Sequence, residues 1–382
     1  MNSEYGGMKD VIVVFSSNVD KWGAERSVCS MCEGLKKRGY DVLVIIPREG
    51  EIISILEEIG IDYLVLPFTV WVYSQKQKMK LVRIMRWFMQ EMFRTRHIIL
   101  EVKRLEYNPI LVYSSTVLFG TGVYCANRWK VGHIHHFREN IDAFGYKFYL
   151  GYNLTMRYIR KHTSHIICTC EAIKEHYIEY LGKAPITVVN NGVPLIKDVT
   201  PRFYDGKIRF VQVARFMDDK RIIDTLHAAK ILCDREVRNY EIDIYGRGEE
   251  ETLYRDYISE NNVSDYVHIK GFVSAIDFSP YHVGLMTSTF EAFARTTLDY
   301  MNNGLAVIAS DSGGNLEQVV ANETGLLFEV KNPQSLADKM EELITHPNLI
   351  SKLGKAGRGR FKQKFTQDKY QEYIVSVFDK YL

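Results

Sequence analysis

The sequence predicts an α/β protein made of two doubly wound, Rossmann-like domains. Three observations support this fold class. The chain has 382 residues, and a single hydrophobic core rarely grows past about 250–300 residues. Short apolar runs of strand length alternate with helical patterns. The alternation begins again near residue 186, so each half of the chain is expected to build its own parallel sheet.

The first half begins with a strand at residues 11–15, because Val-Ile-Val-Val-Phe is a continuous apolar run that suits a strand buried on both faces of a parallel sheet. A polar loop and an amphipathic helix at 24–38 follow, and Gly39 is well placed to end that helix. A second strand is expected at 42–46. A further helix is predicted at 53–59, and strands at 63–66, 110–113 and 166–169.

The second half repeats the pattern after a boundary near 183–185. Strands are predicted at 186–189, 208–213, 242–245, 267–269, 283–286 and 306–309, with helices at 222–233, 291–301 and 315–320. A last amphipathic helix is expected to begin after Thr366, a favourable N-cap. We therefore predict three segments: a first domain at 1–184, a second domain at 185–364, and a terminal helix at 365–382.

Composition and charge argue against a nucleic-acid-binding protein, a secreted protein and a membrane-spanning protein. The net charge is +2 and the pI about 8.1, whereas a nucleic-acid-binding domain usually has a pI above about 9, so no nucleic-acid partner is expected. The run at 11–15 is too short for a signal peptide, and no stretch approaches the ~18 apolar residues of a membrane span. Six irregularly spaced cysteines favour reduced thiols. We therefore expect a cytoplasmic protein.

Cys29 and Cys32 form a lone C-x-x-C pair. A zinc site would need a second pair at ligand spacing, and a redox pair would need its first thiol at a helix N-terminus. The pair falls inside the predicted helix at 24–38, so packing in the core is the favoured interpretation.

Residues that follow the strands are the candidate functional residues, because in doubly wound domains ligands bind beyond the carboxyl ends of the strands. Arg215 and Lys220 follow the strand at 208–213. A guanidinium fork and an ammonium charge together suit a diphosphate, although a solvated basic loop is equally consistent. Gly246, and the pair Gly313 and Gly314, can let the backbone approach a ligand, but such turns also begin many ordinary helices.

Glu291 lies where the strand at 283–286 passes into a predicted helix. The backbone N–H groups of 292–295, which include Ala292, Phe293 and Ala294, are expected to be free donors at the helix N-terminus. Asp299 is eight residues further on and is expected on the same helix face as Glu291. Two such carboxylates can hold sugar and ribose hydroxyls, or they can be a capping glutamate and a solvated aspartate.

The first domain offers Gly23, in the loop after the first strand, where backbone N–H groups can meet a phosphate. It also offers His133, with His135 and His136 beside it. H-x-H-H without a matched second element is a poor zinc site. The alternation fits a strand end, so one histidine can face a ligand, or all three can be satisfied in the core.

Taken together, these residues resemble the retaining glycosyltransferases of family 4, which have the GT-B fold of two facing Rossmann-like domains. The resemblance covers nearly the whole chain and rests on several motifs in order. They are Trp22-Gly-Ala-Glu-Arg-Ser, Asn191-Gly-Val-Pro, Ala214-Arg215 with Lys220, Ser288-Thr-Phe-Glu291-Ala-Phe with Asp299, and Gly313-Gly with Glu317.

The resemblance implies a role for each matching residue. Arg215 and Lys220 would bind the donor diphosphate, Glu291 would lie beside the transferred sugar, and Asp299 would hold the ribose. Gly23 would lie near the phosphates and His133 on the acceptor side. The terminal helix would cross back onto the first domain. No metal would be required.

The sequence also departs from the family pattern. Asp299 replaces a glutamate, Trp22 replaces the first of a usual glycine pair, and Ala214, Ala294 and Arg221 stand where glycine is usual. These changes bear on the identity of the donor more than on the reaction, and they leave room for an inactive protein.

The expected activity is retaining transfer of a hexosyl unit from a nucleotide diphosphate sugar to an acceptor hydroxyl, in cell-surface polysaccharide or glycolipid biosynthesis. A non-catalytic sugar-binding protein and a nucleotide-sugar 2-epimerase of the same fold are the alternatives. A dinucleotide oxidoreductase is disfavoured because no G-x-G-x-x-G follows either first strand.

Residues 74–104 form a basic, amphipathic helical pattern. Leu81, Met85, Phe88, Met89 and Met92 make an apolar stripe, and Trp87 and Phe93 lie among many lysines and arginines. Such a helix can lie on an anionic membrane, which would make the protein peripheral on the inner face of the cell membrane and its glycan acceptor lipid-linked. Alternatively, this segment is a surface helix packed on the first sheet.

Overall fold

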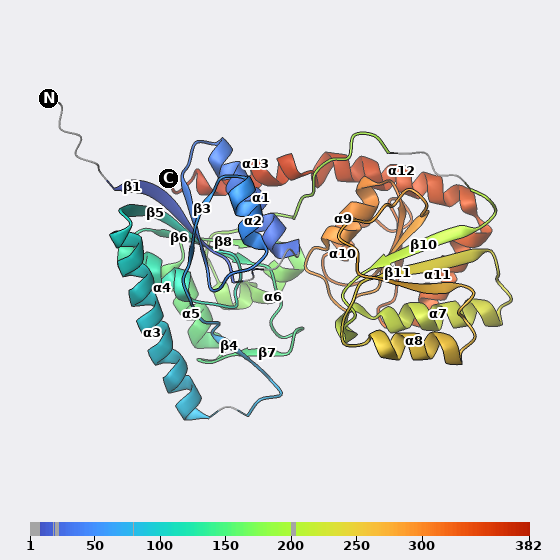
Figure 1. The fold of residues 1–382 in the computed structure, drawn as a ribbon, viewed down its shortest axis with the longest axis horizontal. Coiled ribbons are helices and arrows are strands. Elements are labelled where there is room, and N and C mark those ends of the chain that lie inside the picture. Colours follow the sequence, from blue (N-terminus) through green and yellow to red (C-terminus); the bar gives the residue numbers. More distant parts are fainter. Residues whose placement is uncertain (1–7, 18, 20–22, 79, 200–203) are drawn as a thin grey trace. The chain divides into compact units, whose positions relative to one another are not determined.

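Seven parallel strands and the helices that connect them build the first half of the chain (Figure 1). The computed structural model describes residues 8–17, 19, 23–78, 80–199 and 204–382. Within these residues the chain divides into two units, each with its own sheet. Unit 1 is Met1–Asn190 with Asp368–Leu382, and unit 2 is Asn191–Gln367.

The sheet of unit 1 has the strand order β3-β2-β1-β5-β6-β8-β9. Its strands are β1 (Lys9–Phe15), β2 (Val42–Ile46), β3 (Asp62–Val65), β5 (Tyr107–Ser114), β6 (Gly132–Phe137), β8 (His165–Cys168) and β9 (Ile186–Val188). The connecting helices are α1 (Gly23–Lys37), α2 (Ile52–Glu58), α3 (Leu81–Arg104), α4 (Thr121–Trp129), α5 (Tyr152–His162) and α6 (Glu171–Leu181). A small antiparallel pair, β4 (Val72–Ser74) and β7 (Tyr146–Phe148), stands apart from this sheet.

Both faces of this sheet are covered, as the apolar run at the start of the chain predicts. Ile12 and Val14 pack into the core beneath α1 and α2, whereas Val11, Val13 and Phe15 pack into a second core on the opposite face. All five side chains are fully buried. Successive residues of a strand point to opposite faces, so only a sheet sandwiched between helices can bury every one of them.

The domain boundary lies later in the chain than the predicted position of 184/185. The prediction places the strand at 186–189 in the second domain, but β9 pairs in parallel with β8 and completes the sheet of unit 1. The division therefore falls after Asn190. Apolar periodicity identifies a strand but does not identify its hydrogen-bonding partner, which depends on the tertiary structure.

Unit 2 has a six-stranded parallel sheet of order β12-β11-β10-β13-β14-β15. Its strands are β10 (Ile208–Val213), β11 (Tyr240–Tyr245), β12 (Val267–Gly271), β13 (Val283–Met286), β14 (Ala306–Ser310) and β15 (Leu326–Phe328). Its helical segments are η1 (Asp218–Lys220), α7 (Ile222–Asp234), α8 (Glu251–Glu260), α9 (Arg295–Asn302), α10 (Asn315–Gln318), α11 (Pro333–Thr345) and α12 (Pro347–Lys364).

The terminal helix α13 (Gln367–Phe378) packs on unit 1. Ile374 and Phe378 are fully buried in the core that lies beneath α1. Two hydrogen bonds also join α13 to α1. The Tyr370 hydroxyl donates to the Ser27 carbonyl at 3.0 Å, and Gln371 Nε2 donates to the Ser30 carbonyl at 2.9 Å. The chain therefore leaves unit 1 at Asn190 and returns to it through α13.

Cys29 and Cys32 lie buried within α1. Burial raises the pKa of Cys29 to about 12, which is the opposite of the lowered pKa that a reactive thiol requires. The position of the pair agrees with the core-packing interpretation.

In the described part of the chain, no helix combines the length and the hydropathy that crossing a bilayer requires.

Candidate active site

Loops that follow four strands of unit 2 lie against one another at the carboxyl end of the sheet. They are residues 214–221 after β10, 246–250 after β11, 287–294 after β13 and 311–314 after β14. These four strands are neighbours in the sheet, so the loops meet at one edge. Two backbone bonds join them directly: Thr289 N–H donates to the Asp219 carbonyl at 2.8 Å, and Gly314 N–H donates to the Glu291 carbonyl at 2.7 Å.

Lys220 and Glu291 form an ion pair at the centre of these loops. Lys220 Nζ lies 2.6 Å from Glu291 Oε1 and 3.2 Å from Asp219 Oδ2. The Ser288 hydroxyl donates to the same Glu291 oxygen at 2.7 Å. The side chains of Lys220 and Glu291 are 14% and 19% exposed, so both are partly desolvated and yet remain open to a ligand. The structure therefore brings together the predicted cation and the predicted acid.

Burial lowers the pKa of Lys220, but Glu291 and Asp219 raise it by more, so this pKa lies above its ordinary value. The ammonium group is therefore charged throughout the physiological pH range. Lys220 can therefore bind an anionic ligand at this edge of the sheet when the ligand replaces part of its contact with Glu291.

The segment from Glu291 to Ala294 is not helical, contrary to the prediction of a helix at 291–301. α9 begins at Arg295, and Ala294 is its N-cap residue in an extended conformation. Glu291 thus lies ahead of the helix, so the argument that placed Asp299 on the same helix face as Glu291 is wrong. The helix N-terminal N–H groups belong to Arg295 and the residues after it, rather than to Ala292, Phe293 and Ala294.

Side chains without a predicted contact in the site hold this segment in place. Asn191 Nδ2 donates to the Phe293 carbonyl at 3.0 Å, and Gln318 Nε2 donates to the Ala294 carbonyl at 2.7 Å. Arg295 Nη1 donates to the Gly192 carbonyl at 2.8 Å. The Asn-Gly-Val-Pro motif therefore contributes to the site by fixing the backbone after Glu291. The position of this motif along the chain does not by itself indicate the contact.

The glycines of the site allow protein backbones to approach each other. A Cβ on Gly246 would lie 1.8 Å from the Ala214 carbonyl oxygen, and a Cβ on Gly314 would lie 1.8 Å from the Ala292 carbonyl oxygen. Neither position can therefore carry a side chain. Each of these glycines passes close to a loop that carries a candidate donor-binding residue. Their predicted approach to a ligand stays a prediction.

Arg221, a departure from the family pattern, has a left-handed backbone with φ of +50°. This conformation explains why glycine suits the position. The Arg221 guanidinium contacts fully buried Asp224 through two bonds, of 2.7 and 3.1 Å. Its charge is thus engaged within unit 2 and compensates a buried carboxylate.

Three further predicted residues lie on loops or helix ends of the two units or on α9. Arg215 is exposed in the loop after β10, and Asp299 is half-buried on α9. Gly23 is the first residue of α1, and its carbonyl accepts a bond from the Ser27 hydroxyl at 3.1 Å. Residues 20–22, including Trp22, lie outside the described residues, so the predicted phosphate contact of this loop stays a prediction.

His133 does not lie at the ligand-binding edge of unit 1, contrary to the prediction. It is the second residue of β6, near the amino end of the strand, and it is fully buried. Its ring nitrogens bond to the Ser114 hydroxyl at 2.9 Å and the Thr163 hydroxyl at 3.1 Å. Burial, with His135 beside it, holds the pKa of His133 well below its ordinary value. His133 is therefore a satisfied core residue and cannot contact an acceptor here.

The carboxyl end of β6 instead presents Arg138 and Glu139. The Thr116 hydroxyl donates to Glu139 Oε2 at 2.6 Å. Burial raises the pKa of Glu139 to about 7, against the opposing effects of Thr116 and Arg138. Arg138 Nη2 donates to the Tyr113 hydroxyl at 3.3 Å. These groups lie where the acceptor side of unit 1 is expected. The sequence pattern alone does not show that Arg138 and Glu139, rather than the histidines, occupy this position.

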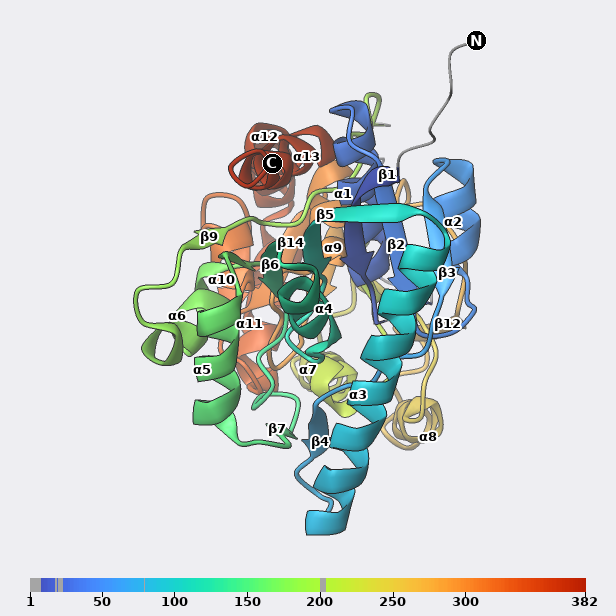
Figure 2. The same cartoon turned by 90° about the vertical axis from the view of Figure 1, so that its left-hand side faces the viewer.

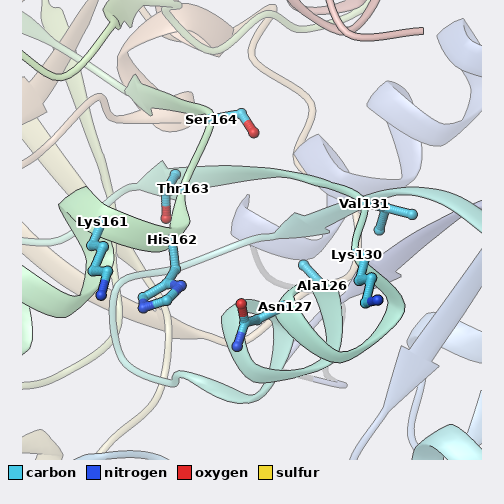
Figure 3. Close-up of a pocket in the computed structure, with 8 residues that line it drawn as sticks. All are labelled: Ala126, Asn127, Lys130, Val131, Lys161, His162, Thr163 and Ser164. Carbon is cyan, nitrogen blue, oxygen red and sulfur yellow. The ribbon is translucent and has the colours of Figure 1, made fainter.

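A hollow of about 340 Å³ lies at the opposite edge of unit 1 (Figure 3). It is bounded by the carboxyl-terminal ends of α4 and α5, and Lys130, Lys161 and His162 line it. Helix carboxyl termini carry partial negative charge and do not attract a phosphate. The hollow is therefore not the candidate site.

Comparison with known families identifies the class of protein that this fold and site define. Residues 197–360 match the model described as Glycosyl transferases group 1, and residues 23–197 match Glycosyltransferase Family 4. The chain therefore belongs to the family 4 glycosyltransferases with the GT-B fold.

Two individual curated relatives share less than a third of their residues with this chain over the matched segments. The chain is 28% identical over 176 residues to the GtfA subunit of the UDP-N-acetylglucosamine–peptide N-acetylglucosaminyltransferase of Streptococcus pneumoniae, covering 46% of this chain and 34% of that one. It is 24% identical over 236 residues to the capsular polysaccharide biosynthesis glycosyltransferase CapM of Staphylococcus aureus, covering 59% of this chain and 61% of CapM. The chain thus spans only a third to three fifths of these relatives.

The fold matches a solved structure over almost its full length. HepE of Anabaena, in complex with UDP and glucose, superposes with a TM-score of 0.78 at 16% identity and covers 97% of this chain and 99% of that chain.

Proposed function

We propose that this protein transfers a hexosyl unit, with retention of configuration, from a nucleotide diphosphate sugar to an acceptor hydroxyl in cell-surface polysaccharide or glycolipid biosynthesis. The observation that carries the proposal is the Lys220–Glu291 pair. It joins a cation and an acid, 71 residues apart in the chain, at the carboxyl end of the sheet in unit 2.

The chemistry of transfer assigns different tasks to these groups. The diphosphate gains negative charge as its bond to the sugar breaks. The cations of Lys220 and Arg215 would stabilise that charge, and preorganised electrostatics of this kind often dominates catalysis. Glu291 would orient the sugar by accepting hydrogen bonds from its hydroxyls. Asp299, on α9, would bind the ribose.

The names of the relatives support the donor and the pathway in this proposal. HepE is described with bound UDP and glucose, GtfA as part of a UDP-N-acetylglucosamine-dependent transferase, and CapM as a capsular polysaccharide enzyme. A nucleotide sugar is accordingly the donor that we propose, with a glycan or a lipid-linked glycan as the acceptor.

We also propose that the reaction requires no divalent metal, because Lys220 and Arg215 supply positive charge where a metal would otherwise neutralise the diphosphate. Turnover measured with excess EDTA should equal turnover measured with Mg²⁺.

The donor site is tested with the double variant Arg215→Ala/Lys220→Ala. Removing both cations should lower turnover by at least about 100-fold, the loss typical of one preorganised transition-state contact. The measurement is release of the nucleoside diphosphate from a panel of nucleotide sugars. Arg215→Ala alone serves as a second variant, because it leaves the Lys220–Glu291 ion pair intact and should fold normally.

The matched control is Lys352→Ala/Lys355→Ala, which removes two exposed cations from α12 of the same unit and should leave turnover unchanged. Equal turnover and equal donor binding in wild type and Arg215→Ala/Lys220→Ala would overturn the assignment. Donor binding without transfer or hydrolysis in the wild type would favour the non-catalytic alternative, and conversion of the nucleotide sugar to its C2 epimer would favour an epimerase.

A further inference from the structure

The first half of α3 exposes a broad apolar face. Its members are large side chains on the outward side of the helix, each at least half exposed: Leu81 72%, Val82 74%, Met85 61%, Phe88 50%, Met89 52%, Met92 57% and Phe93 68%. Residues on a helix recur on one face every three to four positions, so this set forms a continuous surface. Most soluble monomers do not expose apolar patches of this kind without a function.

A different face of α3 packs against unit 1. Trp87, Glu91, Thr95, Ile98 and Val102 are buried, and the Trp87 ring stacks on Tyr149 with 5.2 Å between centroids. α3 is thus a surface helix packed on unit 1, as the alternative predicts, but the apolar stripe is not the face that packs. Trp87 is also not an outward-facing anchor, contrary to its predicted role. The exposed apolar face does not contribute to the packing of α3 on unit 1.

The first half of α3 and the segment before it expose charge of one sign. Glu91 is the only acidic residue between positions 75 and 100. It is buried and accepts hydrogen bonds from Thr69 and Thr121, so it offers no charge to the outside. The same stretch carries seven cationic side chains, namely Lys76, Lys78, Lys80, Arg83, Arg86, Arg94 and Arg96. The exposed apolar face is thus flanked by cations alone.

Other exposed apolar side chains lie on segments near the first half of α3. β4 and β7 lie beside the first half of α3 in both views (Figures 1 and 2). Phe144 and Tyr146, next to and within β7, are 42% and 37% exposed, and Leu150 and Leu154 just beyond it are 40% and 62% exposed. An aromatic ring with a polar tip, such as that of Tyr146, is typical of the interface between lipid and water.

This surface lies at the ligand-binding edge of unit 1. A helix that connects parallel strands runs antiparallel to them, so the beginning of α3 lies towards the carboxyl ends and its last residue precedes β5. One backbone bond ties the β4–β7 pair to the loop after β5: Trp71 N–H donates to the Leu118 carbonyl at 2.9 Å. At the end of the pair, Tyr149 N–H donates to the Trp71 carbonyl, also at 2.9 Å. The apolar surface and the candidate acceptor side therefore share one edge.

We propose that this surface, residues 81–93 of α3 with 144–154, binds the face of an anionic lipid bilayer. The apolar side chains would enter the headgroup region, and the lysines and arginines beside them would contact lipid phosphates. A second copy of the chain, which carries the same cations, would bring like charges together. If the transferase proposal holds, this position presents the acceptor edge to glycans carried on membrane lipids.

The test is co-sedimentation of the full chain with vesicles in the absence of any nucleotide sugar. The wild type should bind vesicles of phosphatidylcholine with phosphatidylglycerol, and bind pure phosphatidylcholine much more weakly. Met85→Gln/Met89→Gln/Met92→Gln should weaken binding by at least about tenfold, because binding strength follows the buried apolar area. Arg83→Gln/Arg86→Gln should reduce the preference for anionic vesicles.

The control is Leu253→Gln, which changes a 51% exposed leucine on α8 of unit 2 and should bind vesicles like the wild type. Two results would overturn the proposal: no binding of the wild type to anionic vesicles, or unchanged binding of the triple methionine variant. A dimer in analytical ultracentrifugation that the triple variant abolishes, without vesicle binding, would assign the surface to self-association. Because donor hydrolysis is assayed without vesicles, failure here is distinguishable from failure of the transferase proposal.

Discussion

At the scale of single residues, the site depends on polar groups whose environments differ sharply. Lys220 keeps its charge because Glu291 lies 2.6 Å away. His133 sits at the centre of a protein core, and burial holds its pKa well below the ordinary value. Both residues look equally polar in the sequence. Which of them can meet a ligand is decided by their positions along strands and loops, and Glu139 rather than His133 reaches the carboxyl end of β6.

The raised pKa of Glu139 predicts how the stability of the protein depends on pH. Its pKa is raised to about 7 in the folded protein from an ordinary value of 4.5, so the folded state binds this proton more tightly than the unfolded state. The contribution of Glu139 to stability is therefore most favourable below about pH 4.5 and declines as pH rises to about 7. Glu139→Gln should reduce the loss of stability between about pH 5 and about pH 7.5 in urea unfolding.

Exposed Glu58 on α2 is the matched position, and Glu58→Gln should retain the wild-type decline. An identical decline in Glu139→Gln and wild type would contradict a raised pKa for this carboxyl.

At the scale of secondary-structure elements, amphipathic patterns identified helices correctly but did not always identify their buried faces. α13 buries the face expected of a terminal helix, with Ile374 and Phe378 in the core of unit 1. α3 buries Trp87, Ile98 and Val102, and leaves a second, larger apolar face outside. A periodic pattern reports which residues share a side of a helix, and the tertiary fold determines what covers that side.

The packing of α13 can be tested with Ile374→Ala. Removing a fully buried isoleucine side chain should destabilise unit 1 by about 2–5 kcal/mol through lost burial and the cavity that remains. Chemical denaturation followed by circular dichroism measures this difference. Glu372→Ala, at an exposed position on the same helix, should change stability by less than about 0.5 kcal/mol. Equal effects of the two substitutions would mean that α13 does not stabilise unit 1.

At the scale of the whole molecule, two units with separate hydrophobic cores make up the chain. All of the described contacts around Lys220 and Glu291 come from unit 2. α13 belongs to unit 1 although it follows unit 2 in the sequence. Donor binding and the packing of α13 should therefore be separable in a measurement that resolves the two units.

Scanning calorimetry of the full chain should resolve two transitions. A nucleoside diphosphate at 100 times its Kd should stabilise the unit that binds it by about 2.7 kcal/mol, and so raise the transition of unit 2. Ile374→Ala should lower the other transition. A nucleoside diphosphate that raised only the transition lowered by Ile374→Ala would place the donor in unit 1 and contradict the assignment of the site.

The sequence by itself determined the fold class, the positions of most strands and the family, because apolar periodicity and ordered motifs are local properties of the chain. β2, β10 and β13 fall where their apolar runs predict them. It also supplied the residues that meet in unit 2, Lys220 and Glu291 among them. The tertiary structure alone decided that β9 belongs to the first sheet, that α9 starts at Arg295, that His133 is buried and that the apolar face of α3 is exposed. Each of these depends on which distant segments pack together, and a pattern along one segment carries no information about its partner.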